Sequence, residues 1–418
     1  MRQFSGWQYL LIDVANASGL DKEIFEKRIE WAEENLAQLE ALTDKAETKP
    51  LYVKAIMAIR KAQKGIPTGH LVGFDAVCSG VQIMSAITGC EAGARATGLI
   101  DTGERPDAYS TTTTVMNYLL AAEGLSVNVS RKDAKIALMT SYYGSKAQPK
   151  NIFGEDTPEL NAFYQAAQIV APGAWELLQE LLASWQPYAL QHAWQLPDGF
   201  EAKVKVMKQK DVRIEVDELD HAEFSYTFYE NEGQKRGLSN VANVVHSIDA
   251  YVLRSVHRRC NYDASLVEQA HGTLKAEAYT RKLGDITRQN IDGDASEALQ
   301  YYMGLYERTG MADVVILPHL LKGQVSYLSD AHIEDLTRIT GKMLEHVPFH
   351  VVTIHDEFKC HPNHMNQLRY WYKEILAELA DSVILADILG QIYGMGGSYN
   401  KLSPNLGAQI RESNYALC

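Results

Sequence analysis

The sequence predicts an α/β protein that is mainly helical, and three observations support this. Helical periodicity dominates residues 1–66, 107–195 and 238–345. Two short apolar strands, His70–Phe74 and Val347–Ile354, lie far apart in the chain, and each leads into an aspartate. A further stretch alternates apolar and polar residues with period two, which is typical of antiparallel ribbons. Helices therefore surround a small amount of sheet.

The composition is that of a globular protein, with 46% hydrophobic and 22% charged residues. Its five cysteines are scattered and form no C-x-x-C pair, which argues against a disulfide framework or a zinc knuckle. Neither a signal peptide nor a membrane-spanning stretch is recognisable, so we expect a cytoplasmic protein without membrane contact. The net charge of −13, taken alone, argues against a protein that coats nucleic acid.

The two strands bring carboxylates to positions where they could meet. Asp75 follows the first strand and Asp356 the second. If both strands belong to one sheet, the two aspartates could hold divalent ions between them. Magnesium favours such a site because it is a hard cation that binds carboxylates and substrate phosphates. Considered singly, each aspartate could equally be an ordinary turn or cap residue.

A basic segment follows the first strand. From Asn128 to Lys150 the chain has five Lys or Arg and one Asp, a local charge of +4. A continuous helix would place on one side the residues Arg131, Lys135, Met139, Tyr143 and Lys146. Cations beside an aromatic ring suit a triphosphate whose base stacks on the ring. The alternative is a solvated helix face.

Three motifs in this order resemble those of the single-subunit RNA polymerases of phages and mitochondria. They are Phe74-Asp75-Ala-Val-Cys78-Ser79-Gly80-Val-Gln82, Arg131-x3-Lys135-x7-Tyr143-Gly144-Ser145-Lys146, and Ile354-His355-Asp356. Shorter matches include Pro106-Asp-Ala-Tyr109 and Val245-His246-Ser-x-Asp249. The resemblance covers most of the chain except about residues 261–345.

The resemblance implies a right-hand polymerase core with palm and fingers, lacking the N-terminal domain and the thumb. The implied parts are palm with the first motif (1–90), fingers (91–195), a β-ribbon similar to a specificity hairpin (196–237), a fingers or palm helix (238–260), a helical insertion (261–345), and palm with the last motif and the C-terminal tail (346–418). On the ribbon, four lysines suit a phosphate backbone: Lys203, Lys205, Lys208 and Lys210.

The resemblance also implies roles for individual residues. Asp75 and Asp356 would hold two Mg²⁺ ions, with the carbonyl of Ala76 as a further ligand. Arg131 and Lys135 would bind the incoming triphosphate, and Lys135 would also steady the leaving pyrophosphate. The remaining implied roles are closure of the nucleotide pocket by Tyr143, sensing of the ribose by Tyr109 and His246, and support of the site by His355 and Gly144.

A motif of the family that contacts the RNA–DNA hybrid contains a Gly-Arg dipeptide, and this sequence has none. We therefore expect a second, smaller polypeptide to carry that motif and the N-terminal domain. This arrangement resembles the split, heterodimeric enzyme for middle transcription in N-four-type phages, with this chain as its larger subunit. The implied partners are a DNA template, NTPs, an RNA product and a helper such as a single-strand-binding protein. Such an enzyme would act in the host cytoplasm.

Three alternatives stay open. A family A DNA polymerase shares the spacing of the second motif and often has His-Asp-Glu in the third. Five residues after the first aspartate, those enzymes typically carry a Glu that blocks the 2′-hydroxyl of a ribonucleotide. This chain has Gly80 at that position. A catalytically inactive subunit would be free to lose Asp75, Asp356 or Lys135, yet all three are present. A metal module on Cys360-His361-x2-His364 lacks a fourth ligand nearby.

Overall fold

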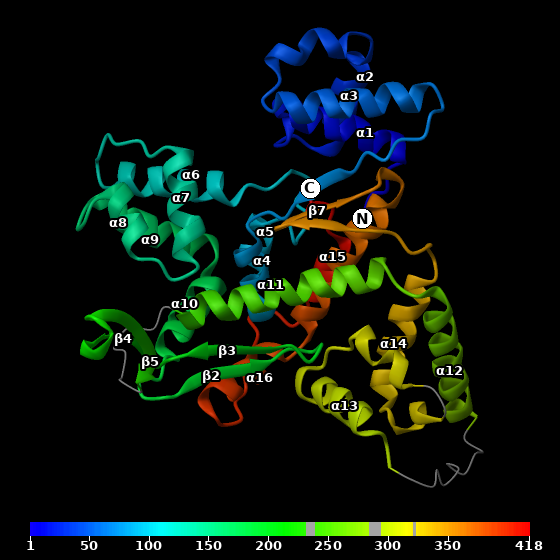
Figure 1. The fold of residues 1–418 in the computed structure, drawn as a ribbon. Coiled ribbons are helices and arrows are strands. Elements are labelled where there is room, and N and C mark those ends of the chain that lie inside the picture. Colours follow the sequence, from blue (N-terminus) through cyan, green and yellow to red (C-terminus); the bar gives the residue numbers. More distant parts are fainter. Residues whose placement is uncertain (231–238, 284–293, 321–322) are drawn as a thin grey trace.

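The computed structural model describes residues 1–230, 239–283, 294–320 and 323–418, and it is mainly helical, as predicted (Figure 1). Within these ranges, no helix has the length and apolar character needed to cross a bilayer.

The first part of the chain is helical, as expected. It consists of α1 (Gly6–Ala15), a π-helical turn (Asn16–Leu20), α2 (Phe25–Glu34), a 3-10 segment (Leu36–Lys45) and α3 (Lys49–Gln63). Ser5 caps α1 in a capping box: its Oγ accepts from the Gln8 amide, and the Gln8 side chain accepts from the Ser5 amide. The buried Arg28 donates to the carbonyls of Asp21 and Glu23, which fixes the turn before α2.

The central sheet has three antiparallel strands in the order β1-β7-β6. They are β1 (Val72–Asp75), β6 (Val352–Ile354) and β7 (Glu357–Cys360). The predicted strand Val347–Ile354 is thus shorter than expected. It is an edge strand, and Val352 and Ile354 are 43% and 51% exposed.

Helices α4 (Ser79–Thr88) and α15 (Met365–Asp381) form the centre of the core. Every residue of α4 is buried. α15 packs on α4, on α17 (Leu406–Glu412) and on α11 (Ser239–Cys260), the long helix that crosses the molecule in Figure 1. The Gln82 side chain on α4 donates to the carbonyl of Ala416, which holds the C-terminal tail beside β1.

A helical lobe projects from one side of this core (Figure 1). It contains α6 (Ala108–Ala122), α7 (Arg131–Ser141), α8 (Ala147–Phe153) and α9 (Pro158–Val170), and α5 (Glu91–Ala96) and α10 (Pro172–Ala183) connect it to α4. α6 packs on α7 and α9, so the basic segment has a firm support.

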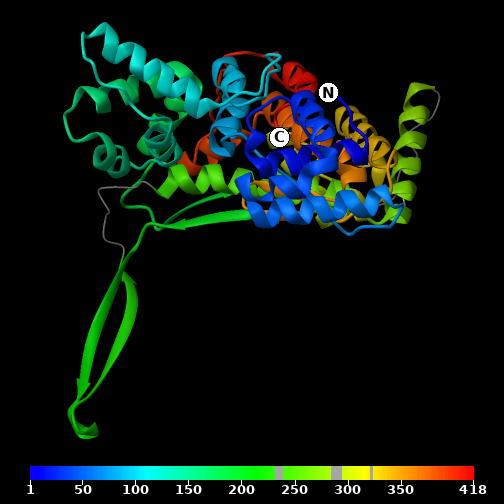
Figure 2. The same cartoon turned by 90° about the horizontal axis from the view of Figure 1, so that it is seen from above.

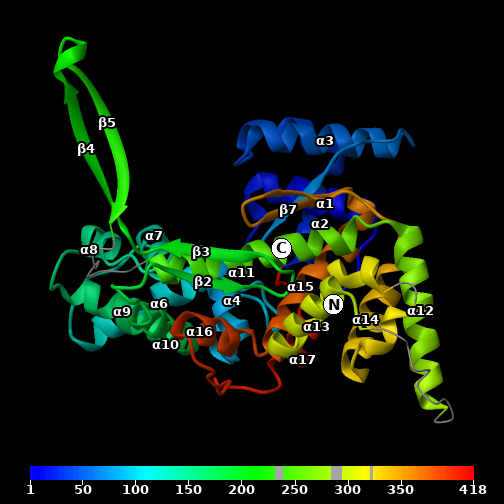
Figure 3. The ribbon, with the colours of Figure 1, turned by 60° about the horizontal axis from the view of Figure 1, so that its bottom comes forward.

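Two separate hairpins follow the lobe. The first pairs β2 (Gln191–Gln195) with β3 (Glu201–Lys205), and the second pairs β4 (Lys208–Val216) with β5 (Ala222–Glu230). The turn at Pro197–Gly199 therefore joins two strands, and β2 occupies a stretch that the periodicity predicted to be helical. The first hairpin packs on α11 and α16 (Ile384–Tyr393), whereas the second extends away from the body (Figures 2 and 3).

The predicted helical insertion is helical where it is described. It contains α12 (Ala264–Lys282), α13 (Glu297–Thr309) and α14 (Asp330–Met343), with 3-10 turns between them. Arg338 on α14 forms ion pairs with Glu374 and Glu378 on α15, and Glu378 also pairs with the buried Arg259 on α11. This network joins the insertion to the core.

Candidate active site

The sheet brings Asp75 and Asp356 together, as the sequence predicted. Asp75 lies at the end of β1, directly opposite Glu357 at the start of β7. Asp356 belongs to the two-residue turn between β6 and β7, and its carbonyl accepts a hydrogen bond of 3.1 Å from the amide of Ala76. One strand pairing therefore joins segments that are far apart in the chain.

The backbone beside both aspartates is unusual. Cys78, three residues after Asp75, has a φ of 57°, and His355, next to Asp356, has a φ of 57°. Neither residue is glycine, and such left-handed backbone costs about 1–3 kcal/mol and concentrates at functional sites. Both turns hold their aspartates at the rim of one cleft.

The carboxylates repel one another. Burial by surrounding atoms, and then the charges of Glu357 and Asp356, raise the pKa of Asp75 to about 6. Asp75 is nevertheless open to the cleft. A divalent cation would relieve this repulsion, and carboxylate and carbonyl oxygens are its preferred ligands. The residues present therefore fit a magnesium site.

The cleft has a volume of about 450 Å³ and contains most of the predicted site. Both acidic and basic side chains line it. Its lining includes Asp75, Ala76, Tyr109, Arg131, Lys135, Met139 and Asp356, together with Lys22, Arg105 and Lys359.

Arg131 is held in place at the start of α7. Its guanidinium contacts Asp107 Oδ2 at 2.7 Å through Nε and Nη2, and its Nε also donates to Ser110 Oγ at 3.1 Å. Asp107 is itself the N-cap of α6. These contacts orient the guanidinium and leave some of its five donors for another anion.

Lys135 lies one turn further along α7 and is exposed to the cleft. Its Nζ lies 5.5 Å from the ring centroid of Tyr109, and the Arg131 guanidinium lies 5.6 Å from the same ring. The Tyr109 hydroxyl is hydrogen-bonded to the Cys78 sulfur, and burial raises the pKa of Tyr109 above its ordinary range. The aromatic ring thus connects the first and second motifs.

Tyr143 does not share the helical face of Lys135, contrary to the prediction. α7 ends at Ser141, and Gly144 has a φ of 90°, so helical periodicity no longer applies there. The Tyr143 ring stacks on His246 at a centroid distance of 4.7 Å and an interplanar angle of 10°. Tyr143, His246 and Gly80 are not among the residues that line the cleft, and their role in nucleotide binding stays a prediction.

Gly80 lies directly under the Tyr143 hydroxyl. A Cβ at Gly80 would approach the hydroxyl oxygen to 2.7 Å, so a side chain at this position would require Tyr143 to move. The hydroxyls of Tyr143 and Ser79 are hydrogen-bonded, and burial raises the pKa of Tyr143 to about 12. The hydroxyl is therefore protonated near neutral pH and can donate.

Lys146 is also misplaced by the helical prediction. It is the N-cap residue before α8 and lines a separate cavity of about 360 Å³, beside Lys150, Tyr164 and Trp175. Only Arg131, Lys135 and Met139 of the predicted face line the cleft, because they lie within the helix that continues to Ser141.

Some residues of the site had no role in the sequence interpretation. Burial, and then Asp356, raise the pKa of Asp249 to about 6, so this carboxyl belongs to the same electrostatic cluster. Asp249 lies three residues after His246 on α11, and that spacing was the available signal. Ser79 and Glu357 are adjacent to predicted residues, but sequence spacing does not reveal their contacts.

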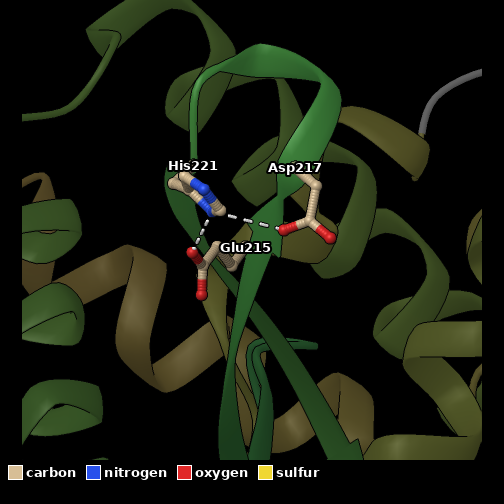
Figure 4. A group of neighbouring side chains, drawn as sticks. All are labelled: Glu215, Asp217 and His221. Carbon is tan, nitrogen blue, oxygen red and sulfur yellow. Dashed lines mark ion pairs between the residues drawn. The ribbon is translucent and has the colours of Figure 1, made fainter.

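A second acidic group lies at the tip of the β4–β5 hairpin (Figure 4). His221 Nδ1 lies 2.7 Å from Glu215 and 3.3 Å from Asp217, and all three side chains are exposed. Among the described residues, it is the one group of three or more ligand atoms within 4.8 Å of each other.

The alternative metal site at Cys360, His361 and His364 does not form such a group. The Cys360 Sγ donates to the His361 carbonyl, and the His364 ring stacks on Phe349.

Comparison with known proteins agrees with the motifs. Residues 3–182 match the family model of DNA-dependent RNA polymerase. A DNA-directed RNA polymerase of Pseudomonas phage phiKMV is 24% identical over 344 residues, which cover 68% of this chain and 41% of that protein. One from Enterobacteria phage K11 is 24% identical over 366 residues, which cover 65% of this chain and 40% of that protein. The chain thus spans about two fifths of the length of these relatives, and the matches support this polymerase family.

Proposed function

We propose that this chain is the catalytic subunit of a DNA-directed RNA polymerase. The observation that carries the proposal is the pairing of β1 with β7, which places Asp75 and Asp356 in the same cleft as Arg131 and Lys135. The reaction is the template-directed attack of an RNA 3′-hydroxyl on the α-phosphate of an NTP, which releases pyrophosphate. Positioning and charge neutralisation supply most of the catalysis in such transfers.

Asp75 and Asp356 would hold two Mg²⁺ ions, with the Ala76 carbonyl as a further ligand. When bound, these ions would activate the attacking oxygen and stabilise the leaving oxygen. Burial, and then repulsion by Glu357 and Asp356, raise the pKa of Asp75, and a cation beside the carboxylates would offset both, which supports this assignment.

The other residues bind and orient the nucleotide. Arg131, fixed by Asp107, would hold the triphosphate, and Lys135 would neutralise charge on the triphosphate and then on pyrophosphate. Tyr143 and His246 would close the nucleotide pocket as a stacked pair, and Tyr109 would line its ribose side. His355 would support the turn of Asp356 near the primer end.

The residues around the proposed position of the nucleotide sugar favour RNA synthesis over DNA synthesis. The close approach of Tyr143 to Gly80 has no room for a blocking Glu at that position. His246 stacks on Tyr143, where a polar ring can hydrogen-bond a 2′-hydroxyl. A family A DNA polymerase would place a bulky group there.

The remainder of the enzyme would come from elsewhere. In this proposal residues 1–90 and 346–418 form most of a palm, residues 91–195 form fingers, and a smaller second polypeptide supplies the N-terminal domain and the Gly-Arg motif. The pair corresponds to the split enzyme of N-four-type phages. It would need DNA template, NTPs and a single-strand-binding protein to start on duplex DNA.

The decisive test is primer extension on a primed template with NTPs or dNTPs, with and without the co-purified smaller chain. Asp356→Ala should reduce RNA extension by roughly 10³-fold or more, because one of the two metal-binding carboxylates is lost. Asp44→Ala removes a carboxylate whose ion pair with Lys49 is on the surface, so it serves as the matched control. Extension retained by Asp356→Ala, or a preference for dNTPs in the unaltered protein, would contradict the proposal.

A further inference from the structure

The β4–β5 hairpin, residues 208–230, has two different faces. It is the outer part of the predicted β-ribbon, and from this point 'the ribbon' means this hairpin alone. The side chains of two directly paired residues lie on the same face, and successive residues along a strand point to opposite faces. One face is largely apolar and carries Val212, Ile214, Val216, Ala222, Phe224, Tyr226 and Phe228; at the base of the hairpin the same face also carries Lys208, Lys210 and Glu230. The Tyr226 and Phe228 rings stack on this face at 5.9 Å. The opposite face is polar and includes Asp211, Arg213, Ser225 and Thr227.

The apolar face is open to solvent in the described structure. Val212, Phe224 and Tyr226 are 42%, 52% and 57% exposed. Neither strand packs substantially on any other described helix or strand, and the ribbon extends from the body (Figures 2 and 3). An isolated two-stranded hairpin is marginally stable in water, and contiguous exposed apolar and aromatic side chains mark interaction surfaces.

The charge of the ribbon restricts what can cover that face. Residues 208–230 contain three Lys or Arg and seven Asp or Glu, which leaves a net charge of −4. Lys210 forms an ion pair with Glu230, and Arg213 forms one with Glu223. On β3, Lys203 is paired with Glu201, and Lys205 lies over the Tyr229 ring. A phosphate backbone is therefore a poor match, which argues against the DNA contact predicted for these lysines.

A second copy of this chain is an equally poor match. The chain carries a net charge of −13, so two copies repel each other, and the acidic ribbon adds to the repulsion. Electrostatic complementarity requires a basic partner, and the aromatic face requires an apolar groove on it.

We propose that the apolar face of the ribbon docks on a second polypeptide whose surface offers an apolar groove flanked by Lys and Arg. The proposal rests on the two-chain enzyme proposed above, and it assigns the ribbon to subunit assembly rather than to promoter DNA. The polar face stays in solvent in the assembled enzyme.

Site-specific photo-crosslinking in the native complex tests this assignment. A photoreactive phenylalanine analogue replaces Tyr226 on the apolar face in one preparation, and Thr227 on the polar face in the matched control. Each is carried by the tagged chain expressed in its native source, and crosslinks are identified by mass spectrometry after irradiation. We expect position 226 to crosslink, at least 10-fold more than position 227, to one polypeptide present in equal amount with this chain, at a segment rich in Lys and Arg.

Other crosslinking results overturn the proposal. They are crosslinks to DNA, to a second copy of this chain or to an acidic segment, equal crosslinking from both faces, and no crosslink at all.

A second measurement uses variants that keep the hairpin pairing. Phe224→Ser together with Tyr226→Ser should weaken association with that polypeptide at least 10-fold, and Ser225→Ala with Thr227→Ala should change it less than twofold. Retained association of the first variant overturns the proposal. Catalysis is tested separately, by primer extension with Asp356→Ala, whereas docking is tested by the crosslinks and by the association of the ribbon variants. Failure of catalysis and failure of docking are therefore distinguishable.

Discussion

The cleft around Asp75 and the tip of the ribbon both gather acidic side chains, but they do so in different ways. At the tip, Glu215, Asp217 and His221 come from one short stretch and are all exposed. In the cleft, Asp75 and Asp356 come from distant segments joined by β1 and β7, and they face Arg131 and Lys135. The tip side chains lie close together, within 4.8 Å of one another, yet the cleft is where we propose metal binding. A cleft and neighbouring charges are better indicators of a functional carboxylate than a short distance to other acidic side chains.

Metal binding separates the two regions most strongly. Asp75→Asn should weaken Mn²⁺ binding, measured by electron paramagnetic resonance, by roughly 10- to 100-fold, because a charged oxygen ligand is lost. His221→Ala should change that affinity less than about twofold, because all three side chains of its group are exposed to solvent. Loss of binding in His221→Ala with no change in Asp75→Asn would move the metal site to the ribbon.

Selectivity for the sugar should change next most strongly, in variants of Tyr143. Tyr143→Phe removes the hydroxyl that contacts Ser79 and should reduce discrimination between NTPs and dNTPs by roughly 10-fold in competitive primer extension.

The adjacent Tyr142 is the matched control. Its buried hydroxyl donates to the Ala167 carbonyl at 2.8 Å, so Tyr142→Phe should lower the free energy of unfolding by about 1 kcal/mol and leave selectivity unchanged. Equal selectivity in both variants would remove Tyr143 from the sugar pocket.

The pH dependence of stability should reflect the group of carboxyls around Asp356. Burial and Asp356 raise the pKa of Asp249 from 3.8 to about 6. The folded carboxyl binds its proton more tightly than the unfolded one, so its stabilising contribution is complete below about pH 4 and is lost as the pH rises through about 6. Asp249→Asn should therefore stabilise the metal-free protein by about 1–2 kcal/mol at pH 8 and by almost nothing at pH 4. Urea unfolding in EDTA at both pH values measures this difference, and identical gains would contradict the assignment.

Removal of the ribbon should have the smallest effect on folding. Lys208 and Glu230 are paired at its base, so a short Gly-containing turn can replace residues between them. The free energy of unfolding should change by less than about 1 kcal/mol in urea titration, because the ribbon packs on little besides itself.

The neighbouring hairpin gives the contrast to this deletion. Trp194 on β2 is buried and donates to Ser247 Oγ at 3.0 Å, so Trp194→Ala should cost about 3–5 kcal/mol. A loss of several kcal/mol on removal of the ribbon would mean that it contributes to the fold of this chain.

Sequence patterns predicted the parts of the site that lie within single elements. Arg131, Lys135 and Met139 share a face because α7 is a regular helix over those positions. The same rule misplaced Tyr143 and Lys146, because the chain leaves the helix at Ser141 and turns at Gly144. A short strand such as β2 was missed because five residues between helical patterns carry little periodic signal.

The sequence by itself determined the order and spacing of the motifs, the aspartates at the ends of two strands, the glycine at position 80 and the acidic composition of the ribbon. Only the tertiary structure decided that β7 lies between β1 and β6, that Tyr143 stacks on His246, and that the apolar face of the ribbon is uncovered. The physical reason is that periodicity is a property of one element, whereas contacts between elements depend on how their buried faces pack together.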